Sequence, residues 1–386
     1  MLLVQYKSKE SDRAIIDDIT AKINQNLGEW YGFHSKLAVE FPTIRSHKNS
    51  FILRYPITTS SGEKKNVLVK IRRYPRMNSL SQAIRADIHG KVPMEYQSLK
   101  YVFDRLVKKD ENFGVVRPLA YFDAYFAIVM EEFPSRTLRQ ILAAHRHSSS
   151  TGKGLNELKD AAKKTGQWLH YFHQHVHSPS EREYTREQIL DEIRSYAIPL
   201  EDCSHGRVHA QSILDAFSQK LENVQIDSIV FSQSHADMIC DNVLYSNDKK
   251  VCVIDFKTRH APIYSDLGLI LIHPETFKLQ IFSGGVYLPE SLLREYRTAI
   301  LEGYFGDKPV DQFFIKLYSA IKVLDRWRKY EEQMRKYKGV RYLILLPIAP
   351  MVTAYFKNVL MKHLDSIEVV ESSQAIKVAK SVDHSA

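Results

Sequence analysis

The chain has 386 residues, of which 44% are hydrophobic and 26% are charged, a composition typical of folded globular proteins and not of disordered chains. At roughly 150 residues per domain, this length predicts two or three units, each with its own core. None of the 15 glycines occurs in G-x-G-x-x-G or G-x-x-x-x-G-K-[ST] spacing, which excludes the Rossmann and Walker phosphate loops.

The net charge of +9 comes from a local excess of basic residues. Residues 44–110 contain fifteen Lys and Arg and five Asp and Glu, so this segment alone carries +10. Such a segment favours an anionic ligand, and nucleotide phosphate is as good a candidate as nucleic acid. A solvated surface of Lys and Arg would give the same pattern.

The sequence shows no segment typical of export or membrane insertion. Its start has neither a cationic region nor an apolar run of signal-peptide length. The longest uncharged stretch, 342–356, has 15 residues and contains two prolines, whereas a bilayer-spanning helix needs roughly 20 residues. The three scattered cysteines, Cys203, Cys240 and Cys252, suit a reducing compartment. We therefore expect a cytoplasmic protein without a signal peptide or a transmembrane helix.

The first third of the chain predicts one helix followed by short strands. Residues 12–27 place apolar side chains on one stripe behind Ser11, which can cap the helix. Runs rich in β-branched and aromatic residues, separated by turn residues, then predict an antiparallel meander. In chain order we expect strands at 37–41, 50–59 and 66–74, a helix from about 93 to 109, and strands at 115–122 and 125–133.

Helical patterns dominate after Pro134. They are interrupted by a loop rich in Ser and Gly at 147–154 and by a β-type hairpin at 243–256. Strands followed by helices indicate an α+β fold with two segregated lobes. We expect helices at about 156–172, 185–224, 289–304, 309–336 and 351–364, and domains at 1–133, 134–366 and a frayed tail at 367–386.

The residues best suited to chemistry lie in the segment SHADMICDNVLYSNDKKVCVIDFK. His235 and Asp237 are followed by Asn242, and Asp255 comes at the end of an apolar run. Two carboxylates and an amide suit phosphoryl transfer, because one carboxylate can accept a hydroxyl proton while the amide and the other carboxylate hold Mg²⁺. Each residue taken alone is more common as a turn or cap residue.

This segment resembles the aminoglycoside phosphotransferase and choline kinase family of the protein-kinase-like superfamily. HADMICDN resembles the family's H-G-D-x-x-x-x-N, VIDF its I-D-[FW], and DLG its D-L-[AG], and the match covers residues from about 37 to 270 in order. The resemblance implies a protein-kinase-like two-lobe fold, with an N-terminal antiparallel sheet lobe containing one key helix and a mainly helical C-terminal lobe. It also implies ATP and Mg²⁺ as cofactors.

The resemblance assigns a role to each matching residue. Asp237 corresponds to the catalytic base, and Asn242 and Asp255 correspond to metal ligands. His235 and Asp266 correspond to structural supports of the catalytic loop.

A strand lysine and a helix glutamate complete the set that such kinases need. Lys70 ends the run VLVK, which resembles the V-A-I-K strand, although an exposed strand lysine would look the same. Glu95 lies in line with Leu99 and Val102 on the apolar face of its helix. A carboxylate there needs a cation, and Lys70 is the predicted one.

The run IVMEEFPS resembles the linker between the two lobes of such kinases. Backbone groups of Glu131, Glu132 and Phe133 are accordingly expected to bind the adenine base.

The sequence departs from the family pattern at three places. The loop IRSHKNS between the first two strands contains no glycine, so any cover of the phosphates is expected from Ser46, Asn49 or Ser50 and from the charges of Arg45 and Lys48, with Ser46 and Lys48 as the preferred candidates. Lys257 stands where such kinases commonly place an acid, and Ala236 replaces the usual glycine. These departures bear on the metal geometry and the subfamily, while the superfamily assignment stands.

Four histidines, His170, His173, His175 and His177, lie close together near the end of a predicted helix. Only the first two share a helical face, and no cysteine or acid completes a ligand set. We therefore do not predict a metal site in this cluster.

Charge in the helical lobe gives conflicting indications about the acceptor. Residues 181–202 contain seven acids and three arginines, a net charge of −4 that favours a cationic acceptor, because the resembling family uses this part of the lobe to hold its acceptor. The stretch 326–341 contains seven Lys and Arg interleaved with Trp327, Tyr330 and Tyr337. That pattern favours an anionic partner or a membrane surface.

Three classes of function remain open. The preferred one is an ATP-dependent phosphotransferase that acts on a hydroxyl of a small molecule, with a sugar or glycan precursor as the favoured acceptor. A non-catalytic nucleotide-binding or scaffold protein is the alternative, because a degenerate kinase could also lack the glycine loop. A protein kinase is disfavoured, since Asp255-Phe256-Lys257 lacks the glycine of D-F-G and no A-P-E follows.

We expect no nucleic-acid partner. Any association with a membrane surface should be weak and salt-sensitive, because the two prolines in 342–356 break the helix that an interfacial element would need.

Overall fold

The computed structural model describes residues 10–47, 49–74, 77–85, 91–106, 113–147, 153–204, 206–222, 224, 226, 228–336 and 347–367. The chain forms two compact units. The first unit comprises Met1–Ser135 together with Cys252–Lys257, and the second comprises Arg136–Val251 together with Thr258–Ala386. The sequence did not indicate that the short segment Cys252–Lys257 returns to the first unit.

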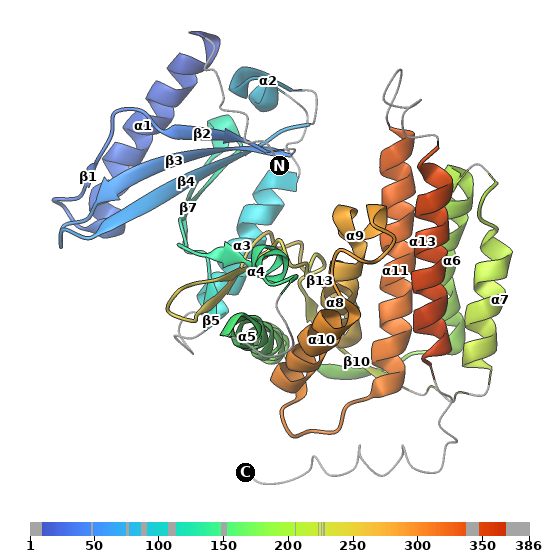
Figure 1. Cartoon of the computed structure of the whole chain (residues 1–386). Helices are drawn as coiled ribbons and strands as arrows, with labels where there is room; N and C mark the ends of the chain where they lie inside the picture. The colour runs from blue at the N-terminus through green and yellow to red at the C-terminus, as the bar shows by residue number, and fades with distance from the viewer. Residues whose placement is uncertain are drawn as a thin grey trace. The chain divides into compact units, whose positions relative to one another are not determined.

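The first unit is built on an antiparallel sheet whose strands are bonded in the order β1-β3-β4-β7-β6, with β2 also on β3. Side chains alternate along β3, so that Phe51, Leu53 and Tyr55 are buried. The apolar stripe of α1 packs into the same core (Figure 1). The elements are α1 (Glu10–Tyr31), β1 (Lys36–Leu37), β2 (Thr43–Ser46), β3 (Ser50–Thr58), β4 (Lys64–Arg72), β6 (Pro118–Phe122) and β7 (Ala127–Glu131).

Two further helices belong to the first unit. The short α2 (Leu80–Arg85) begins at the carboxylate of Asp12, which accepts hydrogen bonds from the backbone N–H of Leu80 at 3.2 Å and of Ser81 at 3.0 Å. Helix α3 (Lys91–Leu106) buries an apolar face that includes Val102. The strand β5 (Phe113–Val115) follows, and β6 leads into the 3-10 helix η1 (Asp123–Tyr125).

Helices dominate the second unit. α6 (Arg186–Ser204), α7 (Ala210–Leu221), α11 (Gln312–Arg335) and α13 (Ala349–Asp365) lie side by side (Figure 1). Trp327 of α11 is buried and stacks on Phe356 of α13, with the ring centroids 6.0 Å apart. Trp327 is therefore part of the core and is not available to a membrane surface.

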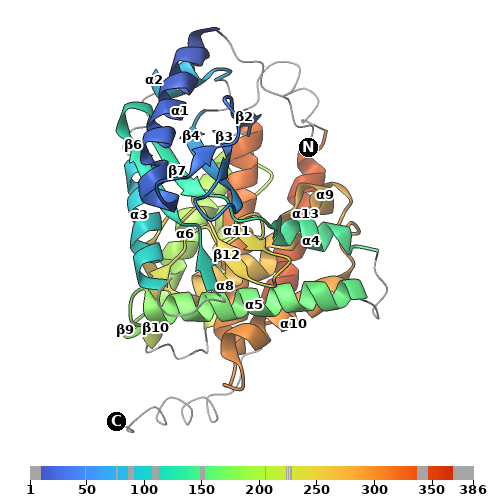
Figure 2. The ribbon, with the colours of Figure 1, turned by 90° about the vertical axis from the view of Figure 1, so that its left-hand side faces the viewer.

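Two glycines set the distance between α5 (Lys153–His175) and α10 (Glu290–Phe305), which run side by side (Figure 2). A Cβ atom on Gly166 would lie 2.1 Å from the carbonyl oxygen of Ile300, and one on Gly303 would lie 1.9 Å from that of Lys163. The two helices thus meet backbone to backbone, and no larger residue fits at either position.

The remaining elements of the second unit connect these helices. β10 (Ser228–Ser234) lies between β13 (Arg259–Pro262) and β9 (Ser180–Glu183), and β11 (Val243–Tyr245) pairs with β8 (Arg136–Thr137). The chain passes from the second unit into the first at β12 (Val251–Val253). The short helices are α4 (Leu138–Ala144), α8 (Ile263–Ile272), η2 (His273–Thr276) and α9 (Lys278–Phe282).

The predicted α+β class is confirmed, and most predicted elements are present with ends shifted by a few residues. The predicted strand 125–133 begins later, at Ala127, because η1 ends in Phe126 with a left-handed φ of 46°. The predicted helix 185–224 is two helices, separated by a turn in which Gly206 has a φ of 79°. Of the predicted tail 367–386, all but Ile367 lies outside the described residues.

Among the described helices, none has both the length and the apolar character required to cross a bilayer.

We expect Gly303→Ala to lower the free energy of unfolding by about 1–3 kcal/mol, because the added methyl group has to push α5 and α10 apart. Gly28→Ala is the matched control, since Gly28 is also helical but its Cβ would meet no atom closer than 3.7 Å. That control should be neutral or stabilising by up to about 1 kcal/mol. Urea unfolding of both variants checks this, and a Gly303→Ala protein as stable as the wild type would contradict the close approach.

Candidate active site

Lys70, Glu95 and Asp255 are joined by ion pairs in the first unit. The Nζ atom of Lys70, on β4, lies 2.8 Å from Oε1 of Glu95, on α3, and also contacts Oδ1 of Asp255. The side chains of Lys70 and Glu95 are only 11% and 8% exposed. The structure thus brings together three predicted site residues from distant parts of the sequence.

Arg72 is a second cation on Glu95, which the sequence reasoning missed. Its Nε atom lies 2.5 Å from Oε2 of Glu95. The available signal was the i, i+2 spacing of Lys70 and Arg72 on one strand, which points both side chains to the same face. Burial alone would lower the pKa of Lys70, but the charges of Asp255 and Glu95 outweigh it and raise that pKa. Lys70 therefore remains an ammonium cation at neutral pH.

The backbone amides of the linker residues are not equally available. The N–H of Glu131 donates to the carbonyl oxygen of Arg117 at 3.0 Å, and that of Glu132 donates to the carbonyl oxygen of Asn66 at 2.8 Å. No residue in the described part of the chain accepts a hydrogen bond from the Phe133 amide. Of the three predicted adenine-binding residues, only Phe133 therefore offers a backbone donor, because the other two amides are used within the protein.

The side chains of Glu131 and Glu132 are held on the sheet. Glu131 accepts hydrogen bonds from Lys65 at 2.9 Å and from the hydroxyl of Tyr31 at 3.1 Å, and Glu132 accepts from Nε of Arg54 at 2.8 Å. These contacts fix the start of the linker.

The predicted phosphate-covering residues lie at the end of β2. Ser46 is its last residue, and the turn that follows is closed by a 2.8 Å hydrogen bond from the His47 amide to the Ser50 carbonyl oxygen. Lys48, within this turn, lies outside the described residues.

The loop from His235 to Asn242 follows β10 in the second unit. The side-chain NH₂ group of Asn242 donates to the backbone carbonyl oxygen of Asp237 at 2.9 Å. The Oδ1 atom of Asn242 therefore points away from that carbonyl group. The backbone N–H of Asp237 donates to Nδ1 of His235 at 3.2 Å. The loop therefore connects Asp237 to both predicted neighbours by hydrogen bonds.

Asp266 holds the beginning of this loop. Its buried carboxylate accepts hydrogen bonds from the amides of His235 at 2.7 Å and Ala236 at 3.1 Å, and from the hydroxyl of Ser234 at 2.9 Å. Nε2 of His173 lies 3.3 Å away. Burial would raise the pKa of Asp266, but the hydrogen bond and charge of His173 and the loop contacts lower it, so the carboxylate is ionised at neutral pH.

His173 is the member of the histidine cluster that takes part in this arrangement. It is buried on α5, and its Nδ1 atom lies 2.7 Å from the hydroxyl of Tyr304. No group of three or more potential metal ligands occurs among the described residues. The signal in the sequence was a histidine on the apolar face of a long helix, in line with Leu169 and Phe172.

Ala236 has a φ of 62°, in the left-handed region that favours glycine. The backbone conformation explains why glycine is usual at this position of the motif. Here the two Asp266 contacts hold an alanine in that conformation. Asp255, at a φ of 64°, has the same backbone region.

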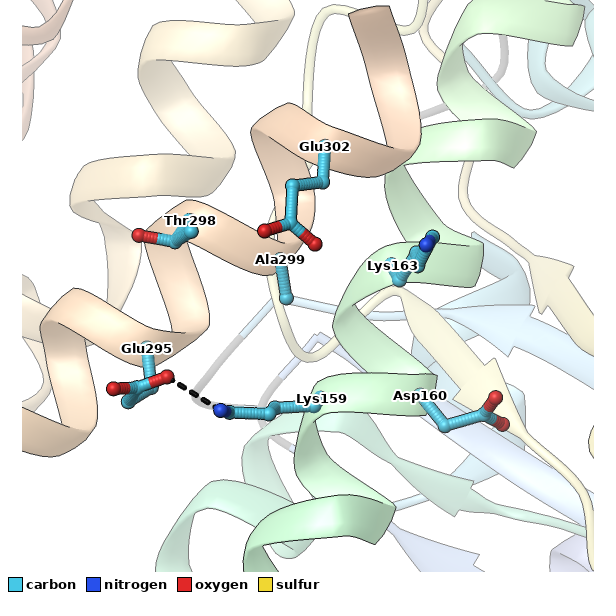
Figure 3. Close-up of a pocket in the computed structure, with 7 residues that line it drawn as sticks. All are labelled: Lys159, Asp160, Lys163, Glu295, Thr298, Ala299 and Glu302. Atoms are coloured by element: carbon cyan, nitrogen blue, oxygen red, sulfur yellow. Dashed lines mark ion pairs between the residues drawn. The ribbon is translucent and has the colours of Figure 1, made fainter. Parts of the chain in front are cut away.

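Two pockets lie within the second unit. One, of about 270 Å³, lies between α5 and α10 and contains the Lys159–Glu295 ion pair at 2.7 Å (Figure 3). None of the predicted site residues lines it. The other, of about 200 Å³, is lined by Ile239 and Asp241, which belong to the loop between Asp237 and Asn242.

Neither a family model nor a curated protein matches the sequence. Several solved structures align with most of the chain. A glucosamine kinase in complex with glucosamine, ADP and inorganic phosphate aligns with a TM-score of 0.51 and 10% identity, over 86% of this chain and 82% of that chain. A macrolide 2'-phosphotransferase type I aligns with a TM-score of 0.46 and 14% identity, over 96% of this chain and 100% of that chain. A choline kinase from Streptococcus pneumoniae aligns with a TM-score of 0.44 and 15% identity, over 90% of this chain and 99% of that chain.

The chain therefore has the protein-kinase-like fold, as the motifs predicted.

We expect Ala236→Gly to stabilise the protein by about 0.5–1 kcal/mol. Glycine removes the strain of the left-handed conformation, about 1–2 kcal/mol, but it loses more conformational entropy on folding than alanine, which offsets part of the gain. Ala162→Gly is the matched control, since Ala162 is buried inside α5. It should destabilise the protein by about 1 kcal/mol or more. Thermal unfolding of both variants checks this, and a loss of stability in Ala236→Gly would show that the alanine methyl group is needed.

Proposed function

We propose that the protein is an ATP-dependent phosphotransferase that transfers a phosphoryl group to a hydroxyl of a small molecule, with a sugar or glycan precursor as the preferred acceptor. The observation that carries this proposal is the buried lysine of β4 in ion pairs with both Glu95 and Asp255. Phosphoryl-transfer enzymes of this fold need such a lysine on the nucleotide phosphates and such a glutamate to hold it.

In this proposal residues 1–133 are the nucleotide-binding lobe and 134–366 the catalytic and acceptor-binding lobe. Lys70 binds the nucleotide phosphates, and the Phe133 amide donates to adenine. Ser46 and Lys48 are proposed to cover the phosphates. The carbonyl groups of Glu131 and Glu132 remain candidates for accepting from the base.

Asn242 and Asp255 are the proposed metal ligands. The oxygen atoms of an amide and a carboxylate are the hard donors that Mg²⁺ prefers, and the hydrogen bond from the amide nitrogen of Asn242 to Asp237 leaves its oxygen for this purpose. When bound, Mg²⁺ neutralises charge on the phosphates.

Asp237 is the proposed catalytic base, which accepts the proton of the acceptor hydroxyl. His235 and Asp266 position Asp237. The carboxylate of Asp266 accepts hydrogen bonds from the two backbone amides that precede Asp237, and the imidazole of His235 accepts one from the backbone amide of Asp237. The three cysteines are free, and Cys240 and Cys252 are buried. This supports the proposal of a reducing, cytoplasmic location.

A non-catalytic nucleotide-binding protein is the second candidate. The glycine-free loop 44–50 and the exposed Lys257 favour it, because both change how phosphates and metal are held. The two candidates differ in whether Asp237 matters for phosphoryl transfer.

We expect millimolar MgATP to raise the melting temperature of the wild-type protein by several degrees, since a ligand at 100 times its Kd stabilises the native state by about 2.7 kcal/mol. Asp237→Asn should keep this shift, because a base acts on the acceptor proton. Lys70→Ala and Asp255→Asn should reduce it, because they act on phosphate and metal. A thermal scan without any shift in the wild type would refute nucleotide binding.

Asp237→Asn should also lower turnover by a factor of about 10²–10⁴, measured as ADP release with an acceptor. Asp248→Asn, an exposed carboxylate on the hairpin turn that follows β11, is the matched control and should leave turnover unchanged. Wild-type turnover in Asp237→Asn would contradict the assignment of the base and favour the non-catalytic alternative.

A further inference from the structure

The pocket beside the catalytic loop contains more cations than its acids can pair. It is lined by Arg139, Lys278, Arg326 and Lys329, against the single carboxylate of Asp241. Ile239 and Asp241 place this pocket next to Asp237 in the sequence of the loop, on the same unit as the proposed base. An acceptor in this pocket could reach Asp237 without leaving the second unit.

Two of the four cations have carboxylate partners. Nη1 of Arg139 lies 3.2 Å from Oδ2 of Asp241, and Nζ of Lys329 lies 2.6 Å from Oδ2 of Asp325. Within the described part of the chain, the side chains of Arg326 and Lys278 form no ion pair or hydrogen bond, although the carboxylates of Asp237, Asp325 and Asp241 act on Arg326 electrostatically. The unpaired positive charge of the pocket therefore belongs to Arg326 and to the exposed Lys278.

Arg326 is the more informative of these two cations. It is half-buried at the pocket wall, and burial lowers its pKa although Asp237, Asp325 and Asp241 act in the opposite direction. A guanidinium has five N–H donors in a planar fork, which matches two oxygens of a phosphate or carboxylate. Removing it from water without an acceptor costs free energy, and an oxyanion in the pocket would supply that acceptor.

Buried contacts hold the turn that contributes His273 to the pocket wall. His273 is buried, its Nδ1 atom accepts a hydrogen bond from the Cys240 amide at 3.1 Å, and burial and two arginines lower its pKa, so it is neutral. In the same turn, the buried carboxylate of Glu275 lies 2.8 Å from both Arg297 and His363. Burial would raise the pKa of Glu275, but these partners lower it to about 2. The turn that contributes His273 to the pocket is thus held by buried hydrogen bonds and ion pairs.

The acidic segment 181–202 does not form this wall. None of its residues lines the pocket, and Glu192 of α6 lies 3.4 Å from Nζ of Lys322 and accepts from the hydroxyl of Tyr196 at 3.2 Å. Within the segment, Arg194 pairs with Asp191, so that carboxylate is already engaged. The net charge of −4 therefore does not create a cation site beside the catalytic loop.

We propose that this pocket binds an anionic group of the acceptor through Arg326, so that the acceptor is a hydroxylated small molecule that also carries a phosphate or a carboxylate. The inference rests on the proposed function and adds the chemical class of the substrate. Phosphate and carboxylate share the planar arrangement of two oxygens that Arg326 would bind.

The test uses four probes of one carbon skeleton: glucose, glucosamine, glucose 6-phosphate and gluconate. Their binding to the full chain is measured by calorimetry in the presence of the nonhydrolysable nucleotide AMP-PNP with Mg²⁺, so that the nucleotide site is occupied. ADP release with ATP is measured in parallel. We expect glucose 6-phosphate or gluconate to bind at least tenfold more tightly than glucose and glucosamine, and the preferred one of the two identifies the anion.

Arg326→Gln should remove this preference by weakening the anionic probe at least tenfold while leaving the neutral probe unchanged. Arg326→Lys, which keeps the charge but loses the fork, should have an intermediate effect. Arg294→Gln, an exposed arginine on α10, is the matched control and should change nothing. Where ADP release is measurable, the variants should raise KM for the anionic acceptor and leave kcat within about threefold.

Three results would overturn the inference: a preference for glucosamine or glucose, no binding of either anion, or the same anion preference in Arg326→Gln. A different result would reject the proposed kinase function without rejecting the anion pocket. Anion binding that depends on Arg326, without ADP release from any probe and without a thermal shift by MgATP, would keep the pocket and reject the kinase.

Discussion

The buried carboxylate of Asp266 is the constraint on which the loop from His235 to Asn242 depends. It is 1% exposed and accepts from two successive loop amides and from a serine hydroxyl. Burying an isolated carboxylate would cost free energy, but hydrogen bonds to the ionised form of Asp266 offset this desolvation penalty. Because Asp266 binds consecutive amides, it imposes a sharp turn at Ala236 and thereby fixes the direction in which Asp237 leaves it.

Much of the fold could be predicted from the sequence because strands and helices have distinct apolar periods. The pairing of Lys70 with Glu95 was also within reach, since a carboxylate on an apolar helix face requires a cation. What could not be predicted were contacts between side chains far apart in the chain. His173 lies 93 residues before Asp266, and nothing local in either segment indicates the other. The hydrogen bonds that occupy the amides of Glu131 and Glu132 depend on strand pairing in the same way.

The charge of a segment is a poor guide to the ligand of the surface it forms. The acidic segment and the basic helix of the second unit gave opposite indications in the sequence, because a sum over residues ignores which charges face one another. Asp325 neutralises Lys329 within α11, and Lys322 lies against Glu192. A cation such as Arg326, which forms no direct ion pair among the described residues although Asp237, Asp325 and Asp241 act on it electrostatically, has donors left for a ligand.

The first unit is discontinuous, since it is completed by Cys252–Lys257. Lys70 and Asp255 are 185 residues apart, so during synthesis the ammonium group of Lys70 has only the carboxylate of Glu95 as a partner until the ribosome has made nearly half of the second unit. At 5–20 residues per second this interval is on the order of ten seconds. The first unit is consequently complete only once residue 257 has been made, and a fragment that ends at Ser135 would lack the carboxylate of Asp255 that pairs with Lys70.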